Sequence, residues 1–197
     1  MQFRSARRFQ KTSPLFRWAE ERGDLNKAGR ALVFGAGHLG EATALSQMSW
    51  QVDAVELPES VALRPEVYAD FDKREGCRVL TSLQAARKAY DLVLVTHVLE
   101  FVESPKERRE TLRDLGRRLA SNGKLLLSLR GWSDVNAAKK RTPRGDGVVT
   151  GLGTWTRGFT TEEAEKLLAS AGLTVSANPR STKSKSPEQV RLVCQRL

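Results

Sequence analysis

Apolar residues occur along this chain in short unbroken runs, separated by longer stretches in which they return every three or four positions. Short runs are typical of buried strands in a parallel sheet, and the longer period indicates helices. The expected strands cover residues 32–34, 52–57, 78–80, 91–95, 124–129, 173–177 and 189–195. Their alternation with helices predicts an α/β fold with a doubly wound, Rossmann-like, seven-stranded and mostly parallel sheet in three α/β/α layers. The last two strands are expected to form an antiparallel hairpin.

The helices between these runs have recognisable start and stop signals. One helix is expected over residues 38–48, after a glycine-rich turn. The patterns Ser-Pro-Lys-Glu at 104–107 and Thr-Thr-Glu-Glu at 160–163 are capping boxes that begin two more. Gly123 and Gly172 are expected to end these two helices.

Two segments fall outside this alternation. Residues 1–30 hold eight basic and three acidic side chains together with aromatic residues, and we expect a helical arm or lid there. Residues 131–158 are rich in glycine, threonine and basic residues, and so long a segment without strand or helix patterns is usually functional or disordered. We therefore expect a basic N-terminal arm and one domain over residues 31–197, in which residues 131–158 form a mobile substrate loop.

Composition excludes several classes of protein. The 197 residues suit one ordinary domain, and the chain has no apolar run long enough to cross a membrane. The N-terminus is basic but lacks the apolar stretch of a secretory signal, so we expect a soluble, cytoplasmic protein. Cys77 and Cys194 lack the spacing of a metal site or a disulfide framework. We expect two buried free thiols and no metal.

The chain carries a formal net charge of +10, which is unevenly distributed. Residues 31–103 contain six Lys and Arg against eleven Asp and Glu, so the positive excess lies in the flanking segments. A cationic surface favours polyanions such as nucleic acid, although many basic proteins use charge for solubility alone. Charge therefore suggests a nucleic-acid partner without deciding the matter.

The strongest chemical signal is the glycine turn Gly-Ala-Gly-His-Leu-Gly at residues 35–40, directly after the first expected strand. Main chain can approach a ligand closely only where no Cβ intervenes, and the following helix N-terminus offers free N–H groups. Glu56 ends the next strand, where a carboxylate can accept hydrogen bonds from a ribose. The pattern predicts a nucleotide cofactor and fits both NAD(P) and S-adenosylmethionine.

Further segments resemble one particular family when they are taken in order. Residues 91–102 resemble its motif after strand four, residues 119–128 its fifth strand, and residues 158–173 the helix before its sixth strand. Over residues 31–197 the chain thus resembles the class I S-adenosylmethionine-dependent methyltransferases, in the subgroup with a His-Val-Leu-Glu type motif after strand four. The resemblance implies S-adenosylmethionine as cofactor and methyl transfer to an oxygen or nitrogen acceptor.

The resemblance also implies where the cofactor is held. The implied cofactor residues are Gly35, Ala36, Gly37, Gly40, Glu56, Leu57, Thr81, Ser82, Thr96 and His97. His97 is the candidate catalytic base, since a neutral imidazole can take a proton near pH 7. A positioning role for His97 is the alternative.

The acceptor is the least determined part. The segment after strand five offers candidate substrate residues, which are Lys139, Lys140, Arg141, Arg144, Trp155 and Arg157. The turn after strand four lacks the Pro-Pro-aromatic clamp of adenine methylation, and the chain lacks the Pro-Cys pair of cytosine methylation. Three hypotheses stay open: a methyltransferase acting on nucleic acid, one acting on a small molecule, and a non-catalytic nucleotide-binding or NAD-binding module. The third is kept because residues 33–40 also resemble the NAD-type fingerprint of xanthine dehydrogenase accessory proteins.

Overall fold

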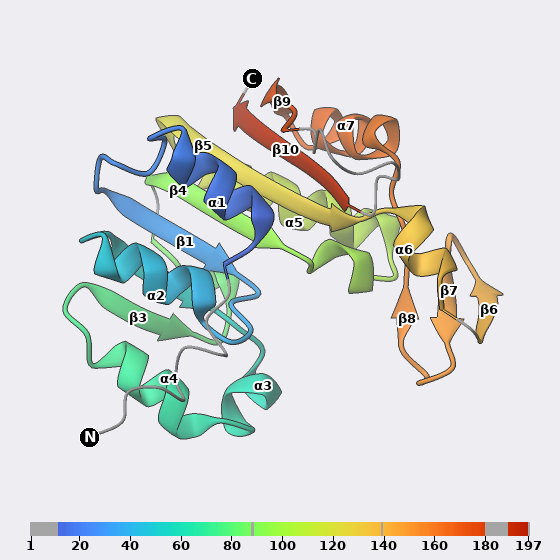
Figure 1. Ribbon diagram of the computed structural model, residues 1–197, viewed down its shortest axis with the longest axis horizontal. Helices are drawn as coiled ribbons and strands as arrows, with labels where there is room; N and C mark the ends of the chain where they lie inside the picture. Colours follow the sequence, from blue (N-terminus) through green and yellow to red (C-terminus); the bar gives the residue numbers. More distant parts are fainter. Residues whose placement is uncertain (1–11, 88, 139, 180–188, 197) are drawn as a thin grey trace.

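The computed structural model describes residues 12–87, 89–138, 140–179 and 189–196, and its centre is a seven-stranded sheet between two layers of helices (Figure 1). In the order β3-β2-β1-β4-β5-β10-β9, the strands are Cys77–Leu80, Gln51–Val55, Arg30–Phe34, Tyr90–Thr96, Leu119–Arg130, Gln189–Arg196 and Leu173–Ala177. Strands β1 to β5 are parallel, and β10 runs antiparallel to both β5 and β9. The predicted fold class is confirmed. The segment that links β9 to β10 lies largely outside the described residues.

Helices cover both faces of the sheet. In Figure 1, α1 (Pro14–Glu21) and α2 (Gly40–Gln47) lie in front of it, and α5 (Pro105–Arg117) and α7 (Thr161–Ser170) lie behind it. Alternate residues of β4 show why. Leu92 and Leu94 belong to the core beneath α1 and α2, whereas Val93 and Val95 belong to the core beneath α5 and α7. The remaining elements are α3 (Pro58–Ala62), α4 (Pro65–Asp72), α6 (Trp132–Asn136), and the 3₁₀ turns η2 (Leu83–Ala85) and η3 (Leu99–Phe101).

Helix α1 is the described part of the predicted N-terminal arm. The Ser13 hydroxyl accepts from the Phe16 N–H and caps the helix, while Leu15, Phe16 and Ala19 are buried. These side chains pack into the core shared with α2 and β4, so this helix belongs to the layer that covers the sheet. Residues 1–11 lie outside the described part of the chain.

The helix predicted from residue 104 ends earlier than expected. It stops at Arg117, and Leu119 already pairs with Tyr90 as the first residue of β5. A Cβ at Gly123 would lie 2.5 Å from the Tyr90 carbonyl oxygen. Gly123 therefore permits the close approach of β4 and β5, and its reading as a helix stop was wrong.

The segment 131–158 is not a loop, as was expected from its composition. It contains α6 and a second, antiparallel sheet of β6 (Arg141–Arg144), β7 (Gly147–Thr150) and β8 (Trp155–Thr156), which extends beyond the end of β5 (Figure 1). Every residue of β6 is exposed and one of them is proline, so this strand has no apolar alternation to reveal it. The prediction of a loop was wrong for that reason.

No helix in the described part of the chain is both long enough and apolar enough to cross a membrane.

Candidate functional site

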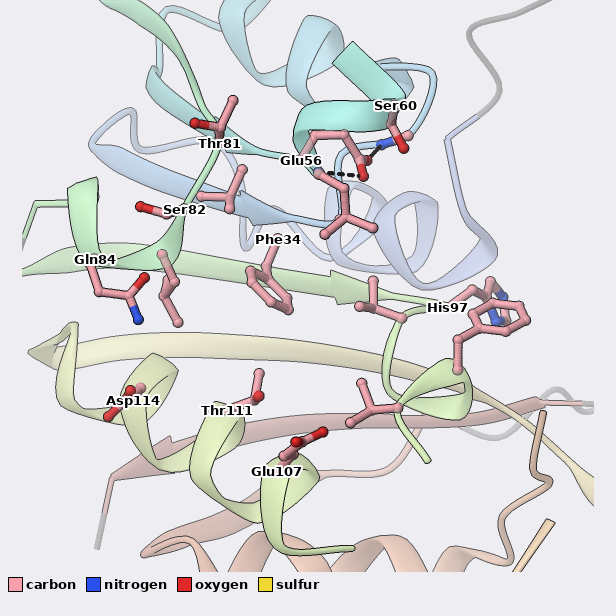
Figure 2. Close-up of a pocket in the computed structure, with 18 of the residues that line it drawn as sticks. Phe34, Glu56, Ser60, Thr81, Ser82, Gln84, His97, Glu107, Thr111 and Asp114 are labelled. Carbon is pink, nitrogen blue, oxygen red and sulfur yellow. Dashed lines mark hydrogen bonds between the residues drawn. The ribbon is translucent and has the colours of Figure 1, made fainter. Parts of the chain in front are cut away.

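A cavity of about 810 Å³ opens where β1, β2 and β4 end, on the side to which their carboxyl ends point (Figure 2). Seven of the predicted cofactor residues line it: Gly35, Gly37, Glu56, Leu57, Thr81, Ser82 and His97. Ligands of open α/β sheets bind at this edge because the strand order reverses there, here between β1 and β4. The structure thus gathers residues from four separate loops around one space.

The glycine turn forms one wall of this cavity. Gly35 has a φ of +71° and Gly37 a φ of +50°, both in the left-handed region that favours glycine. A Cβ at Gly35 would lie 2.2 Å from the Val98 side chain. The N–H groups of Gly35 and Ala36 both donate to the Val55 carbonyl, so the sheet edge already uses the two amides expected to face a ligand.

Glu56 holds the turn from the neighbouring strand. Its carboxylate accepts from the Gly37 N–H at 2.5 Å and from the Leu57 N–H at 2.9 Å. The Tyr68 hydroxyl donates to the Gly37 carbonyl oxygen from the other side. The dashed lines in Figure 2 mark the two contacts of Glu56. The carboxylate predicted to meet a ribose therefore stands at the cavity wall, bound to main chain.

Three predicted cofactor residues do not line the cavity. Gly40 is the first residue of α2, and Ala36 lies within the turn. The Thr96 hydroxyl donates to the Glu41 carboxylate at 3.1 Å, and the same carboxylate accepts from the Ser13 N–H at 3.2 Å. The side chain of Thr96 is thus engaged in joining β4 to α2.

Helix α5 supplies a wall that sequence reasoning missed. Glu107, Glu110, Thr111 and Asp114 line the cavity, and Figure 2 shows α5 opposite Glu56 and Thr81. The spacing of these residues puts them on one face of a helix, which was the available signal, but a polar helix face is usually taken as solvent-exposed. With Glu56, four carboxylates line the cavity, and the described lining contains neither Lys nor Arg. Such a wall attracts cations and hydrogen-bond donors.

His97 follows β4 in a left-handed conformation with a φ of +56°. Its Nδ1 lies 2.9 Å from Oε1 of Glu100, a side chain that is wholly buried, whereas the imidazole is 29% exposed. Oε2 of Glu100 has no hydrogen-bond partner within the described residues. An ionised Glu100 fixes the proton on Nδ1 and leaves Nε2 as an acceptor. The sequence suggested His97 but gave no sign that Glu100 orients it.

Trp155 and Arg157, which were predicted as substrate residues, are engaged within the protein. Trp155 is 8% exposed, and its indole N–H donates to the Arg144 carbonyl. The Arg157 guanidinium pairs with Asp146 and with Glu163, and only 13% of this side chain is exposed. Both residues hold the small sheet in place.

A buried arginine also attaches the small sheet to the rest of the protein. Arg108 of α5 is 1% exposed, pairs with Asp146, and donates to the carbonyl oxygens of Val102 and Glu103. Burial lowers the pKa of its guanidinium, and the Asp146 carboxylate opposes that effect. The charged cluster therefore joins α5 to the β6–β7 turn.

The other predicted substrate residues that the structure describes lie on or beside β6. Arg141 donates to the Asn136 carbonyl, and Arg144 pairs with Glu103 at 2.9 Å. Lys140 is exposed and lines a different cavity, which is described below. Lys139 lies outside the described residues.

Comparison with known proteins gave no match to a protein family or to a curated protein. Solved structures, in contrast, match over nearly the whole chain. One is the 1,6-didemethyltoxoflavin-N1-methyltransferase of Burkholderia thailandensis, solved with 1,6-didemethyltoxoflavin and S-adenosylhomocysteine bound. It matches with a TM-score of 0.71 and 17% sequence identity, and the match covers 98% of this chain and 81% of that one. The chain has the fold of the class I S-adenosylmethionine-dependent methyltransferases.

Two more structures with this methyltransferase fold agree with it closely. The CcbJ methyltransferase from Streptomyces caelestis gives a TM-score of 0.72 at 15% identity, over 92% of this chain and 90% of that one. The glycopeptide N-methyltransferase MtfA gives a TM-score of 0.68 at 20% identity, over 98% of this chain and 99% of that one.

The described residues contain no group of three or more His, Cys, Asp or Glu side chains that could hold a metal ion.

Proposed function

We propose that this protein transfers a methyl group from S-adenosylmethionine to an oxygen or nitrogen of a small molecule. The observation that carries the proposal is the cavity at the carboxyl edge of the sheet, with its glycine turn, Glu56 and an acidic α5 wall. S-adenosylmethionine bears a positive sulfonium and an ammonium group, which suit a cavity lined by carboxylates. The structures of the same fold named above include methyltransferases that act on small molecules, which supports the choice of acceptor.

Each wall has a proposed role in holding the cofactor. Glu56 would accept hydrogen bonds from the ribose hydroxyls, and Thr81 and Ser82 would contact the adenine. Phe34, Leu83 and Val98 give the adenine an apolar surface. Bound S-adenosylmethionine supplies a methyl group that its positive sulfur has already activated. The protein then has to align the acceptor, exclude water and dispose of a proton.

His97 is the proposed proton acceptor. Its Nε2 is the ring nitrogen left open by the contact between Nδ1 and Glu100, and the residue lines the cavity. Glu100 is then a positioning residue, because its buried carboxylate fixes the tautomer and stabilises the imidazolium that forms. Replacing Glu100 with Gln should lower kcat and shift its pH profile while leaving cofactor affinity unchanged.

The cofactor assignment is tested by calorimetric titration with S-adenosylmethionine, S-adenosylhomocysteine and NAD. Hydrogen bonds to a charged group are worth about 1.5–3 kcal/mol, so Glu56→Gln should weaken S-adenosylmethionine binding roughly 10- to 100-fold. The matched control is Glu59→Gln, which alters an exposed carboxylate that does not line the cavity. Preference for NAD would refute the proposal and favour the non-catalytic nucleotide-binding module.

Binding measurements at several salt concentrations test the nucleic-acid alternative. Two of the predicted substrate cations are paired within the protein, Arg144 with Glu103 and Arg157 with Asp146 and Glu163. A nucleic-acid acceptor requires affinity that falls steeply as salt rises, whereas a small acceptor in a cavity does not. Steeply salt-dependent binding of RNA or DNA fragments would overturn the small-molecule assignment and leave the cofactor assignment in place.

A further inference from the structure

A second cavity, of about 560 Å³, lies between the end of β5 and the small sheet. Its lining residues are Phe101, Arg130, Ala138, Lys140, Thr150, Gly151, Leu152, Thr154 and Thr156. Phe101 lines this cavity and also the first one, and 44% of its surface is exposed. The two cavities are therefore neighbours with a shared aromatic wall. A volume of this size suits a small molecule.

The charge of the second cavity is opposite to that of the first. Two cations, Arg130 and Lys140, line it, and its described lining contains no carboxylate. The Arg130 guanidinium lies 5.5 Å from the centre of the Phe101 ring and 3.4 Å from an Asp134 oxygen, so its charge is partly neutralised. Lys140 has no ion pair among the residues that the structure describes. The exposed Lys140 ammonium is thus available to pair with an anion at this wall.

A buried hydroxyl is the second, independent observation. Thr156 lines the cavity, is 2% exposed, and its Oγ1 has no hydrogen-bond partner within the described part of the chain. A buried polar group without a partner costs about 1–3 kcal/mol, which a ligand that bonds to it would recover. Because Oγ1 is itself inaccessible, it can donate to a bound molecule only after the side chain turns toward the cavity.

We propose that the second cavity holds the methyl acceptor, and that the acceptor is a small molecule with an apolar body and a carboxylate. Phe101, Ala138 and Leu152 contact the body, Lys140 pairs with the carboxylate, and Thr156 turns its hydroxyl toward the ligand to donate a hydrogen bond. Because Phe101 lines both cavities, the second cavity lies beside the first, which His97 lines, and the reacting end of the acceptor lies at the boundary between them. This inference rests on the proposed function, because it names the acceptor of the same reaction.

The experiment uses matched pairs of probes that differ only in charge: benzoate with benzamide, and 2-naphthoate with 2-naphthamide. Each is titrated into the full-length protein saturated with S-adenosylhomocysteine, and binding is followed by NMR of backbone amides. We expect the carboxylates to bind at least tenfold more tightly than the amides and to shift the signals of Thr156 and Gly151. Lys140→Met should abolish the preference, whereas Lys166→Met, an exposed control on α7, should not.

Thr156→Val separates a ligand contact from a structural one. If the hydroxyl serves the ligand, this variant binds the probes more weakly while its thermal midpoint is unchanged or higher; a lower midpoint with unchanged probe affinity would contradict that role. Equal affinity for carboxylate and amide, signals that shift away from this cavity, or no carboxylate binding would overturn the inference. S-adenosylmethionine affinity is measured separately on each variant. If the unaltered protein did not bind S-adenosylmethionine, the proposed function would be refuted instead.

Discussion

Replacing Gly35 with alanine should destabilise the protein for two reasons that can be separated. The φ of +71° is in the left-handed region, which costs a residue with a Cβ about 1–2 kcal/mol. The added Cβ would also lie 2.2 Å from Cγ2 of Val98, and an extra methyl group in a packed site costs about 1–3 kcal/mol. The expected loss in free energy of unfolding is therefore roughly 2–5 kcal/mol.

Two controls assign these costs. Gly145 has a φ of +61°, and apart from its two chain neighbours no atom of the described residues lies within 4 Å of an added Cβ. Gly145→Ala should therefore show the backbone cost alone, about 1–2 kcal/mol. In a Val98→Ala background the clash is relieved, and Gly35→Ala should then cost no more than Gly145→Ala does. Urea unfolding measures each free energy, and thermal midpoints should fall by roughly 2–4 °C per kcal/mol. Equal losses for Gly35→Ala and Gly145→Ala in the unaltered background would refute the close approach of Val98.

Three further predictions concern buried charges and thiols. Burial alone would raise the pKa of Asp53, but hydrogen bonds from Arg78 and Tyr90 outweigh that effect and hold the pKa below the ordinary value of an aspartate. The stabilisation from Asp53 is therefore present above the ordinary pKa and is lost as pH falls through the lowered one, so Asp53→Asn should flatten the acid limb of the unfolding free energy against pH. Arg108→Met removes the bonds of a buried guanidinium to the Val102 and Glu103 carbonyls, while Asp146 keeps Arg157 as a partner. It should therefore cost about 1–3 kcal/mol in urea unfolding, against almost nothing for the exposed neighbour Arg109→Met. Burial raises the pKa of the Cys194 thiol to about 12. Iodoacetamide at pH 8 should therefore leave Cys194 unalkylated, as measured by mass spectrometry, until urea unfolds the protein. Rapid labelling of Cys194 in the folded protein would contradict this burial.

The parts of the fold that have a strong local signal could be predicted from the sequence. The apolar run at 91–95 became β4, and the reciprocal hydrogen bonds of Thr160 and Glu163 begin α7 as the capping-box pattern indicates. Glu56 and the glycine turn met at one cavity because the carboxyl ends of parallel strands share an edge. Both cysteines are buried and free, as expected.

The rest depends on contacts between residues far apart in sequence. Arg157 was read as a substrate residue because an arginine in a glycine-rich segment shows no partner, yet Asp146 and Glu163 neutralise it in the fold. The sequence around Glu100 does not indicate that this side chain is completely buried, because its burial depends on the residues that pack over η3. The acidic face of α5 became a cavity wall only through its placement opposite β2 and β3. Single-sequence patterns describe periodicity, and these features are consequences of packing.

The position of β10 bears on how the protein is made. Its residues come last in the described chain, yet β10 lies between β5 and β9 in the sheet. At synthesis rates of about 5–20 residues per second, several seconds pass between the emergence of β5 and that of β10 from the ribosome. Until then β5 presents an unpaired edge that another nascent chain can join. The risk of aggregation through this edge is therefore greatest during translation, and it falls when β10 pairs with β5.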